Sequence, residues 1–485
     1  MEKRVHKITF YHPKIEKLIG CLKEGYLVGG FIRDRLLRVR KEYLDVDLVV
    51  KGIKESQVRC IGKELKAKPF KFKKVKEVVS FSGDGWRVDL SEMEGSSIEE
   101  DLKKRDFTVN AIAVDVRELS LPFNDDVLLI DPTGGYEDLI KGVIRPTHKE
   151  SLREDPIRIL RGVRLKLTLD FSYCESFISL SRKASPLIEK VPRERVGEEV
   201  KKMAETESFW KALKDLETIG ALFPTFKELK GIEKIPPSGL HQYDLKEHSI
   251  KTVYFLEEFA LKEAKELFKD FFPQIKERKK CLKLVALYHD VGKPLTVKEV
   301  NGKLTFYNHD KIGAEITRKG LIELGFGKEC GKLGYYVVRN HLRPFFLYDL
   351  YRKGKLSKRA VYKFFRDTKD YAFHTLTLSI ADFMATSKDM ENSVAEYLDF
   401  LIYLRDFYTE RLKELKPILT GREIMEIKGL SKPNRVIGEI KEKLLELQAL
   451  GKVKTKEEAV KLVKGFNFEN SRKSKLDNNH GDRSS

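Results

Sequence analysis

A short unit near the N-terminus constrains the fold more than any other part of the sequence: residues 25–50 read GYLVGGFIRDRLLRVRKEYLDVDLVV. The apolar run 26–28 and the alternating, β-branched run 44–50 each predict a strand. The glycine pair at 29–30 predicts a turn, and apolar side chains at helical spacing over 31–39 predict a helix. The chain therefore begins with strand, turn, helix and strand, a mixed α/β arrangement.

Two aspartates on the second of these strands indicate a metal site. Asp45 and Asp47 are two residues apart, so their carboxylates point to the same face of the sheet. Neighbouring carboxylates repel each other unless a divalent cation lies between them. Upstream, Gly29 and Gly30 enter a helix, and glycines there let backbone amides approach an anion. A phosphate cradle beside a Mg²⁺ site is what transfer of a nucleotide from a triphosphate requires. Each feature is common alone, but their spacing within one unit is specific.

With Arg33 and Asp34 after the glycines, this unit resembles the polymerase-β-like nucleotidyltransferase superfamily. More narrowly, it is similar to the class II tRNA nucleotidyltransferases and their relatives, the bacterial poly(A) polymerases. Four further stretches match the family's other motifs in chain order: 97–111 (SIEEDLKKRDFTVNA), 131–139 (DPTGGYEDL) followed by Arg145, 154–161 (EDPIRILR), and 193–196 (RERV). Five motifs in one order distinguish the resemblance from a chance match, and it covers residues 20 to about 466.

The resemblance implies roles for individual residues. Asp45 and Asp47, with Asp89 as a third carboxylate by analogy, would hold Mg²⁺ and serve as the catalytic acids. Asp89 is alternatively an edge-strand aspartate paired with Arg87. The nucleotide-binding residues would be Gly29, Gly30 and Arg33 for the phosphates, Arg105 and Asp106 for the ribose, and Asp155, Arg158 and Arg161 in the base-reading motif.

The base-reading motif offers a physical route to selecting cytosine. Asp155 and Arg158 are three residues apart, so on a helix they share one face. An aspartate acceptor beside an arginine donor matches the edge of cytosine, whereas uracil would oppose like with like and leave charged groups unpaired. Arg161 would face the triphosphate. A plainer alternative makes Asp155 a helix N-cap before Pro156, with Arg158, Arg161 and Arg164 forming a solvated basic stripe.

A short loop bears on how many nucleotides are added. Between the strand that ends near Leu90 and residues 98–101, the chain has only SEMEGSS. Family members that add the full CCA carry a longer flexible segment here, thought to reshape the pocket from CTP to ATP. Its loss is typical of CC-adding enzymes, so we expect addition of two cytidines from CTP to tRNA lacking its 3′ CCA. A separate A-adding enzyme would then act afterwards.

Other specificities stay open at this level. If another segment serves as the lever, the enzyme adds the full CCA and also uses ATP. The closest rival is a bacterial poly(A) polymerase. A rival from another class is a metal-dependent phosphohydrolase whose head only binds RNA.

Residues 241–390 hold most of the histidines and form a second candidate metal site. The pattern H…HD…D resembles HD-superfamily phosphohydrolases and can hold a divalent ion of open identity through nitrogen and oxygen ligands. Its members are His248, His289, Asp290 and Asp382. His309 and His341 would ligate a second metal or bind phosphate. The alternative is a degenerate HD fold with a structural role only.

We therefore predict an α+β protein with a small mixed-sheet nucleotidyltransferase head and an elongated, all-α body that includes an HD-like domain. Strand-like runs at 69–90 and 109–116 complete the head. The predicted parts are a head (1–147), a helical neck with the base-reading motif (148–235), an HD-like metal-binding domain (236–400), a helical tRNA-binding segment (401–466) and a disordered tail (467–485).

Composition bears on partners and compartment. The chain has 94 Lys and Arg against 75 Asp and Glu, a net charge of +19, which favours RNA as a polyanionic partner. A solvated surface rich in Lys and Glu is the plainer explanation. No apolar run reaches about 18 residues and no secretory signal opens the chain, so we expect no membrane association. The five cysteines show no CxxC, which argues against a zinc knuckle or a disulfide framework and favours a reducing cytoplasm.

Overall fold

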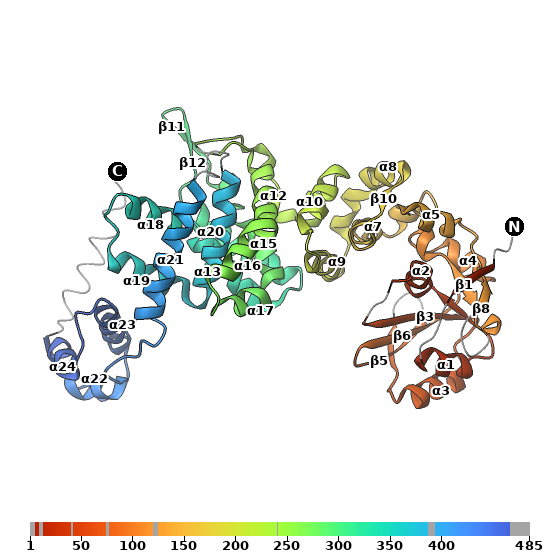
Figure 1. Cartoon of the computed structure of the whole chain (residues 1–485), viewed down its shortest axis with the longest axis horizontal. Helices are drawn as coiled ribbons and strands as arrows, with labels where there is room; N and C mark the ends of the chain where they lie inside the picture. The colour runs from red at the N-terminus through yellow and green to blue at the C-terminus, as the bar shows by residue number, and fades with distance from the viewer. Residues whose placement is uncertain are drawn as a thin grey trace. The chain divides into compact units, whose positions relative to one another are not determined.

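The computed structural model describes residues 5–8, 13–39, 42–73, 77–119, 125–239, 241–386 and 393–465. The chain divides into two compact units, residues 1–230 with 323–326 and residues 231–322 with 327–485. A mixed sheet lies in the first unit and helices make up most of the second (Figure 1). The predicted α+β class is therefore confirmed. The predicted disordered tail, 467–485, lies outside the described residues.

The head is built on a six-stranded sheet. Its strands, in spatial order, are β4 (Phe70–Lys73), β5 (Glu77–Gly83), β6 (Trp86–Glu92), β3 (Leu44–Val50), β2 (Tyr26–Val28) and β7 (Ala113–Asp115). β3 and β6 are parallel and the other pairs are antiparallel, so the sheet is mixed, as predicted. β3 is an interior strand between β2 and β6.

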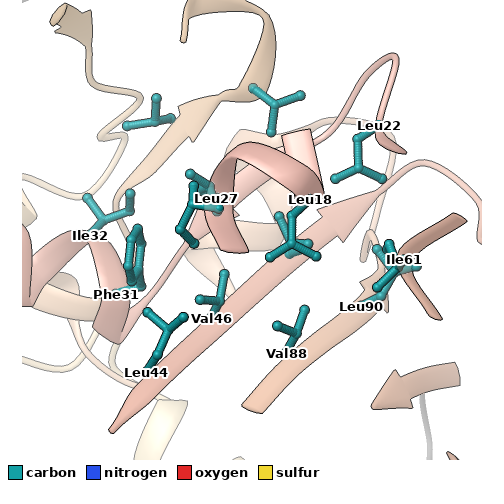
Figure 2. Packing of buried hydrophobic residues seen from close by; sticks show 14 of the residues in the cluster. Leu18, Leu22, Leu27, Phe31, Ile32, Leu44, Val46, Ile61, Val88 and Leu90 are labelled. Carbon is teal, nitrogen blue, oxygen red and sulfur yellow. The ribbon is translucent and has the colours of Figure 1, made fainter. Parts of the chain in front are cut away.

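Alternation along β3 separates the core of the head from its polar face. Val46 is fully buried and packs in one cluster with Val88 of β6 and Leu18 of helix α1 (Pro13–Cys21) (Figure 2). Successive side chains of a strand point to opposite faces, so Asp45 and Asp47 lie on the other side of the sheet. A register slip of one residue would bury both carboxylates in this core, which is why the pattern fixes the register.

The neck follows the head within the first unit. Its helix α7 (Ile157–Leu169) packs against α9 (Arg193–Glu205) and α10 (Phe209–Thr218). The apolar side chains of α7 that face these helices are fully buried, as Ile159 and Val163 show. The unit ends at Lys230, close to the predicted end of the neck at residue 235.

The helices of the second unit surround α20 (Ala372–Thr386), which is buried along almost its whole length. Around it lie α12 (Leu245–Phe255), α15 (Lys279–Tyr288), α17 (Gly327–Asn340), α18 (Arg343–Arg352), α19 (Lys358–Thr368) and α21 (Val394–Arg411). A hairpin of β11 (Lys298–Val300) and β12 (Lys303–Thr305) precedes α16 (His309–Glu323). Within the described part of the chain, no helix is long and apolar enough to span a bilayer.

Three helices after α21 form a small hydrophobic core of their own. They are α22 (Gly421–Lys428), α23 (Arg435–Ala449) and α24 (Lys456–Gly465), and Ile424, Ile440 and Val463 are fully buried among them. The predicted boundary at residues 400 and 401 falls inside α21. Tyr397 and Phe400 of α21 stack with aromatic side chains of the HD region, so the C-terminal segment begins after Arg411.

The cysteines correct one expectation from the sequence. Cys21 and Cys60 form a disulfide between α1 and α3 (Glu55–Leu65), and Cys281 and Cys330 form another between α15 and α17; in both pairs the Cα atoms are 5.6 Å apart. Only Cys174 is a free thiol. The expectation of no disulfides was wrong because partners 39 and 49 residues apart in sequence become neighbours only when the helices pack. The two disulfides also remove the support that cysteine spacing gave to a reducing compartment.

Candidate active site

The acid pair of β3 lies against the glycine turn. Asp47 is the register partner of Val28 on β2, so its carboxylate is next to Gly29, the residue that follows Val28. A Cβ atom at Gly29 would lie 3.1 Å from Asp47 Oδ2 and 3.3 Å from Arg105 Nη1. Gly29 has φ of 73°, which glycine adopts without steric cost. The structure therefore brings together the acids and the turn that the sequence singled out.

A third carboxylate faces the pair from β6. Asp89 is the register partner of Asp47 across the parallel β3–β6 pair. It accepts a hydrogen bond of 2.9 Å from Nε of Arg87. The pairing with Arg87 foreseen as the alternative is therefore present, but β6 is an interior strand and not an edge strand. Pairing with Arg87 does not prevent Asp89 from ligating a metal, because the hydrogen bond from Arg87 uses only one carboxylate oxygen.

The electrostatics of this face favour a cation. Burial raises the pKa of Asp47 to about 6, with Arg105 opposing the shift and the negative charges of Asp45 and Asp89 adding to it. Three carboxylates on adjacent register positions repel one another, and a divalent cation among them relieves that repulsion. The donor set is all oxygen, which suits Mg²⁺.

A cavity of about 430 Å³ opens beside the acids. Its lining includes Gly30, Arg33, Asp45, Asp47 and Arg161. Arg33 is buried and oriented by Asp34, at 2.7 Å, and by Asn110 Oδ1, at 2.6 Å. The arginines of this lining can bind a triphosphate, and its acids can hold the accompanying cation.

The second motif is anchored to the neck by an ion pair. Asp106 is buried and lies 3.2 Å from Nη2 of Arg161, while its other oxygen accepts hydrogen bonds from Asn110 and from the Phe107 amide. Burial alone would raise the pKa of Asp106, but Arg161 and these hydrogen bonds outweigh it and lower the pKa below its usual value. Asp106 is therefore ionised, and it positions Arg161 at the cavity wall.

The base-reading pair is arranged differently from the expectation. Asp155 precedes α7 with an extended backbone, so it does not share a helical face with Arg158. Its carboxylate accepts a 2.8 Å hydrogen bond from Arg195 and makes no cap to the helix. Arg158 donates to the Ser151 hydroxyl and to the Lys104 carbonyl, both at 2.8 Å. The two side chains therefore have separate partners in this structure.

Some residues at the site were not singled out from the sequence. Asn110 links Arg33 to Asp106, Asp101 accepts hydrogen bonds from Arg105, and Arg195 binds Asp155. Asn110 and Asp101 lie within the stretch that matches the second motif, and Arg195 within the fifth. The motif matches could therefore have pointed to these three residues, but they gave no information on which side chains contact each other.

The loop between β6 and α4 (Ile98–Lys103) is short and closed by hydrogen bonds. The Met93 amide donates to the Val50 carbonyl, the Glu94 amide to Asp101 and the Ser96 amide to Glu100. Gly95 has φ of 103°, as a tight turn requires. Ser97 then caps α4. This segment is a fixed turn in the structure.

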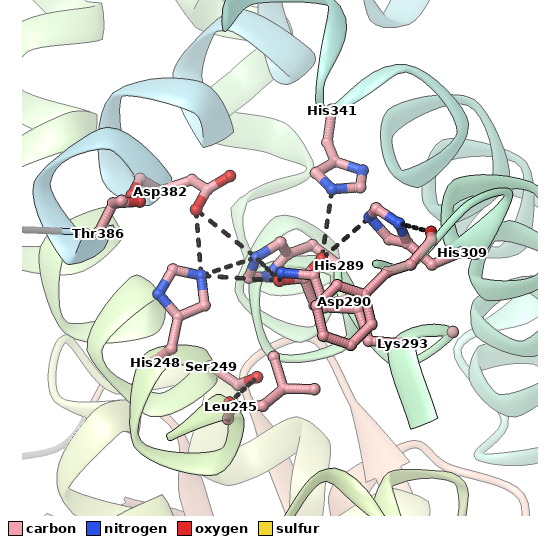
Figure 3. Close-up of polar contacts among 12 residues, drawn as sticks. Leu245, His248, Ser249, His289, Asp290, Lys293, His309, His341, Asp382 and Thr386 are labelled. Atoms are coloured by element: carbon pink, nitrogen blue, oxygen red, sulfur yellow. Dashed lines mark hydrogen bonds and ion pairs between the residues drawn. The ribbon is translucent and has the colours of Figure 1, made fainter. Parts of the chain in front are cut away.

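The second candidate site lies in the second unit, where His248, His289 and Asp382 converge (Figure 3). Nε2 of His248 is 3.2 Å from Nε2 of His289 and 3.1 Å from Asp382 Oδ1. Nδ1 of His248 bonds to the Ala385 carbonyl and Nδ1 of His289 to the Ala286 carbonyl. A carbonyl only accepts, so each Nδ1 carries a hydrogen and each Nε2 faces a common point, where it would offer its lone pair to a cation that displaces any proton there.

A second set adjoins the first through Asp290. Nε2 of His309 and of His341 lie 3.3 and 3.4 Å from Asp290 Oδ1, and Asp290 Oδ2 faces His289. The Nδ1 atoms of His309 and His341 again bond to backbone carbonyls. Asp290 Oδ1 and both Nε2 atoms are buried without a hydrogen-bond partner, as ligands of a cation are before it binds. All six predicted side chains therefore lie in one buried cluster.

The charge of the cluster also fits a cation. Burial opposes a proton on His289, but Asp290 and Asp382 outweigh it and raise the pKa of His289 to about 9. His241 borders the cluster, and burial together with His248 and Lys293 lowers its pKa to about 4. A cavity of about 490 Å³ lined by His241, Lys293 and aromatic side chains opens onto this centre.

Comparison with known families matches the same three parts. Residues 25–145 match the model of the poly A polymerase head domain, residues 175–232 the model of the probable RNA and SrmB-binding site of polymerase A, and residues 245–369 the HD domain. A mixed-sheet head with an acidic site, followed by an RNA-binding region and an HD domain, defines a nucleotidyltransferase that acts on RNA.

Similar proteins narrow this class. The chain is 31% identical to the CC-adding tRNA nucleotidyltransferase of Thermus thermophilus, covering 90% of this chain and 92% of the relative. It is 27% identical to the A-adding tRNA nucleotidyltransferase of Deinococcus radiodurans, over 77% of this chain and 82% of that one. A solved CCA-adding enzyme with CTP, 21% identical, shares the fold with a TM-score of 0.61 over 93% of this chain and 95% of that one. The chain belongs to the class II tRNA nucleotidyltransferases of the CCA-adding family.

Proposed function

We propose that this enzyme adds two cytidines to tRNA that lacks its 3′ CCA end, with CTP as substrate, and then stops. The observation that carries the proposal is the closed turn after β6. A pocket that accepts CTP and then ATP needs a segment that moves. The backbone amides of this turn donate hydrogen bonds to the Val50 carbonyl and to the side-chain carboxylates of Asp101 and Glu100. The similarity to a CC-adding relative supports the same specificity.

In the head, Asp45, Asp47 and Asp89 would hold Mg²⁺. Bound there, Mg²⁺ would lower the pKa of the primer 3′-hydroxyl and neutralise charge on the triphosphate. Gly29 lets backbone and phosphate approach closely, since a side chain there would meet Asp47. Arg33 and Arg161 would bind the triphosphate, each already oriented by a carboxylate partner.

Base selection is assigned to Asp155 and Arg158, with Arg105 and Asp106 near the ribose. Both base-selecting side chains end in groups that complement cytosine: an acceptor for its amino group and a donor for its ring nitrogen and carbonyl. To bind a nucleotide, both side chains give up contacts that they make in this structure. Asp155 gives up its hydrogen bond from Arg195, and Arg158 gives up its hydrogen bond to Ser151. Uracil would place a donor and an acceptor against the wrong groups.

The deciding experiment offers a tRNA transcript without its CCA end to the enzyme with single nucleoside triphosphates and with mixtures. Two cytidines and a stop, with ATP present, support CC addition. Addition of three residues replaces the proposal by full CCA synthesis, and long adenosine tails replace it by poly(A) synthesis. Asp45→Ala and Asp47→Ala should each abolish incorporation while tRNA binding persists.

A second activity is favoured by the six buried ligands around Asp290. We infer that the HD centre binds a divalent metal and hydrolyses phosphate esters such as 2′,3′-cyclic RNA ends. Water would open the cyclic phosphate to a 2′- or 3′-phosphomonoester, and this ring opening should be lost in His289→Ala and retained in Asp45→Ala. Equal ring opening by both variants and wild type would leave the cluster without a catalytic role.

The helices after α21 and the neck are proposed to contact the tRNA body. Phosphate contacts by their Lys and Arg side chains need no base reading, so the shape of the tRNA would select the substrate. The family match of residues 175–232 to an RNA-binding region supports this part of the proposal.

A further inference from the structure

A groove of about 1000 Å³ in the second unit lies beside the HD centre, with which it shares His309. Five aromatic side chains line it, and two of these, Tyr307 after β12 and Phe346 on α18, are 73% and 65% exposed. Large aromatic side chains gain stability mainly by burial. Two that stay exposed in one groove indicate a ligand that covers their faces.

The same groove is lined by cationic side chains. Arg339, Arg343, Arg366 and Lys369 contribute four positive charges against the carboxylates of Asp310, Asp367 and Glu442. Ion pairs with Asp367 orient two of them: Arg343 donates through Nη1 at 2.7 Å and Arg366 lies 2.8 Å away through Nε. Each guanidinium has five N–H donors, so these pairs leave donors for phosphate oxygens.

Two neighbouring cations, Arg339 and Arg343, repel each other, although each also pairs with an acid, Asp310 and Asp367 respectively. Burial lowers the pKa of the Arg339 guanidinium, and the neighbouring Arg343 charge lowers it further. A polyanion bound between them relieves that repulsion. Aromatic faces for stacking beside a row of arginines are the combination that single-stranded nucleic acids require.

The groove adjoins the HD centre. His309 lies in its wall, and Leu304, Phe306 and Leu342 line both the groove and the cavity that opens onto Asp290. A chain lying in the groove can therefore extend across these three side chains to the buried cluster.

We propose that this groove binds single-stranded RNA, with bases stacked on Tyr307 and Phe346 and phosphates on Arg339 and Arg343, and directs its end to the HD centre. The proposal that the RNA end reaches the HD centre rests on the proposed HD activity, whereas the proposal that the groove binds RNA does not.

The test is fluorescence anisotropy of a labelled oligoribonucleotide of about six nucleotides, a length typical of such sites, with the full-length protein. Tyr307→Ala and Phe346→Ala should each weaken binding about tenfold, because each removes one stacking face. Tyr307→Phe and Phe346→Tyr keep the ring and should bind as wild type. Since these side chains are exposed, unfolding midpoints should not change. Unchanged affinity in both alanine variants would overturn the proposal.

Cross-linking with a 4-thiouridine version of the oligonucleotide tests the position. Cross-links in peptides that contain Tyr307 or Phe346 support the groove, and cross-links confined to the head and neck overturn it. An acidic peptide of equal length that competes as well as unlabelled RNA would reassign the groove to a protein partner.

The His289→Ala variant separates the two proposals. It should bind the oligonucleotide as wild type does while hydrolysis of a 2′,3′-cyclic phosphate end to a phosphomonoester is lost. If both binding and hydrolysis persist in this variant, the groove proposal stands and the proposed HD activity fails. If Tyr307→Ala and Phe346→Ala both keep full binding, the groove proposal fails whatever the hydrolysis result.

Discussion

Gly29 and Asp47 lie so close that a single methyl group at Gly29 would come 3.1 Å from the Asp47 carboxylate. The contact arises because Asp47 is paired in register with the last residue of β2, directly before the turn. The glycine therefore serves two purposes: it adopts a left-handed backbone and it leaves space for a metal-binding acid.

This relationship predicts that Gly29→Ala lowers activity by displacing Asp47. A contact of 3.1 Å forces a shift of the carboxylate, and because a misplacement of about 1 Å at a reacting centre costs about a hundredfold in rate, a smaller shift should cost about tenfold. Gly134→Ala is the matched control, since Gly134 also has positive φ, 75°, but has open space around its Cβ position. Gly134→Ala should lose about 1–2 kcal/mol of stability, because its backbone lies in the left-handed helical region. Gly29→Ala should lose at least as much, because φ of 73° with ψ of −140° lies outside that region, where glycine is strongly preferred. Only Gly29→Ala should lower CMP incorporation; equal losses in the two would trace the effect to strain.

The raised pKa of Asp47 predicts a pH limit on magnesium use. Without metal the carboxyl is protonated below a pH of about 6, so a cation must displace a proton there. The Mg²⁺ concentration for half-maximal CMP incorporation should be constant above this pKa and rise about tenfold per pH unit below it. Asp89→Asn removes one repelling charge and should move the break to lower pH. If the Mg²⁺ concentration for half-maximal incorporation shows no change of slope with pH near 6, Asp47 is not the metal ligand that titrates there.

Base selection by Asp155 predicts a loss of discrimination in Asp155→Asn. The preference for CTP over UTP, as a ratio of kcat/KM, should fall by about tenfold or more, because the acceptor for the cytosine amino group is altered. Glu154→Gln is the control: Glu154 is the neighbouring carboxylate, more exposed and paired with His148 at 3.0 Å. Its ratio should match wild type. An intact ratio in Asp155→Asn would leave Asp155 as a structural partner of Arg195.

The ligand cluster around Asp290 predicts bound metal in the purified protein. Elemental analysis should find metal retained in Asp45→Ala and lowered in His248→Ala and His341→Ala, since each removes a buried nitrogen ligand. Removal of metal by a chelator should lower the unfolding midpoint, because binding of the metal to the folded cluster contributes to the stability of the fold. His374→Gln is the control, as His374 is a buried histidine on α20 that belongs to neither ligand set.

The disulfides predict few reactive thiols. The native protein should show one, from Cys174, and the reduced, unfolded protein five. Reduction of either bridge should destabilise the protein by about 2–4 kcal/mol, because the unfolded chain regains freedom. Cys174→Ser should leave stability unchanged and remove the native signal. Five reactive thiols in native protein would show that neither bridge forms.

Local pattern was enough to foresee several elements. Alternation in β3 predicted a strand with Asp45 and Asp47 on one face, and the turn, the helix after it and the long helices beyond the head followed from spacing. The helix-sharing argument for Asp155 and Arg158 was wrong, because Pro156 fixes the start of α7 and leaves Asp155 outside it. The cysteine argument was wrong because spacing in sequence does not report which helices pack together.

What the sequence by itself determined is the class of the chain: five ordered motifs, an acid pair on a strand and an H…HD…D pattern need only local order and periodicity. Tertiary structure alone decided the partners, such as Asp47 beside Gly29, Arg161 on Asp106, and one Asp290 between two histidine sets. The physical reason is that distance and burial, which set charge interactions and ligand geometry, arise only when segments remote in sequence pack against each other.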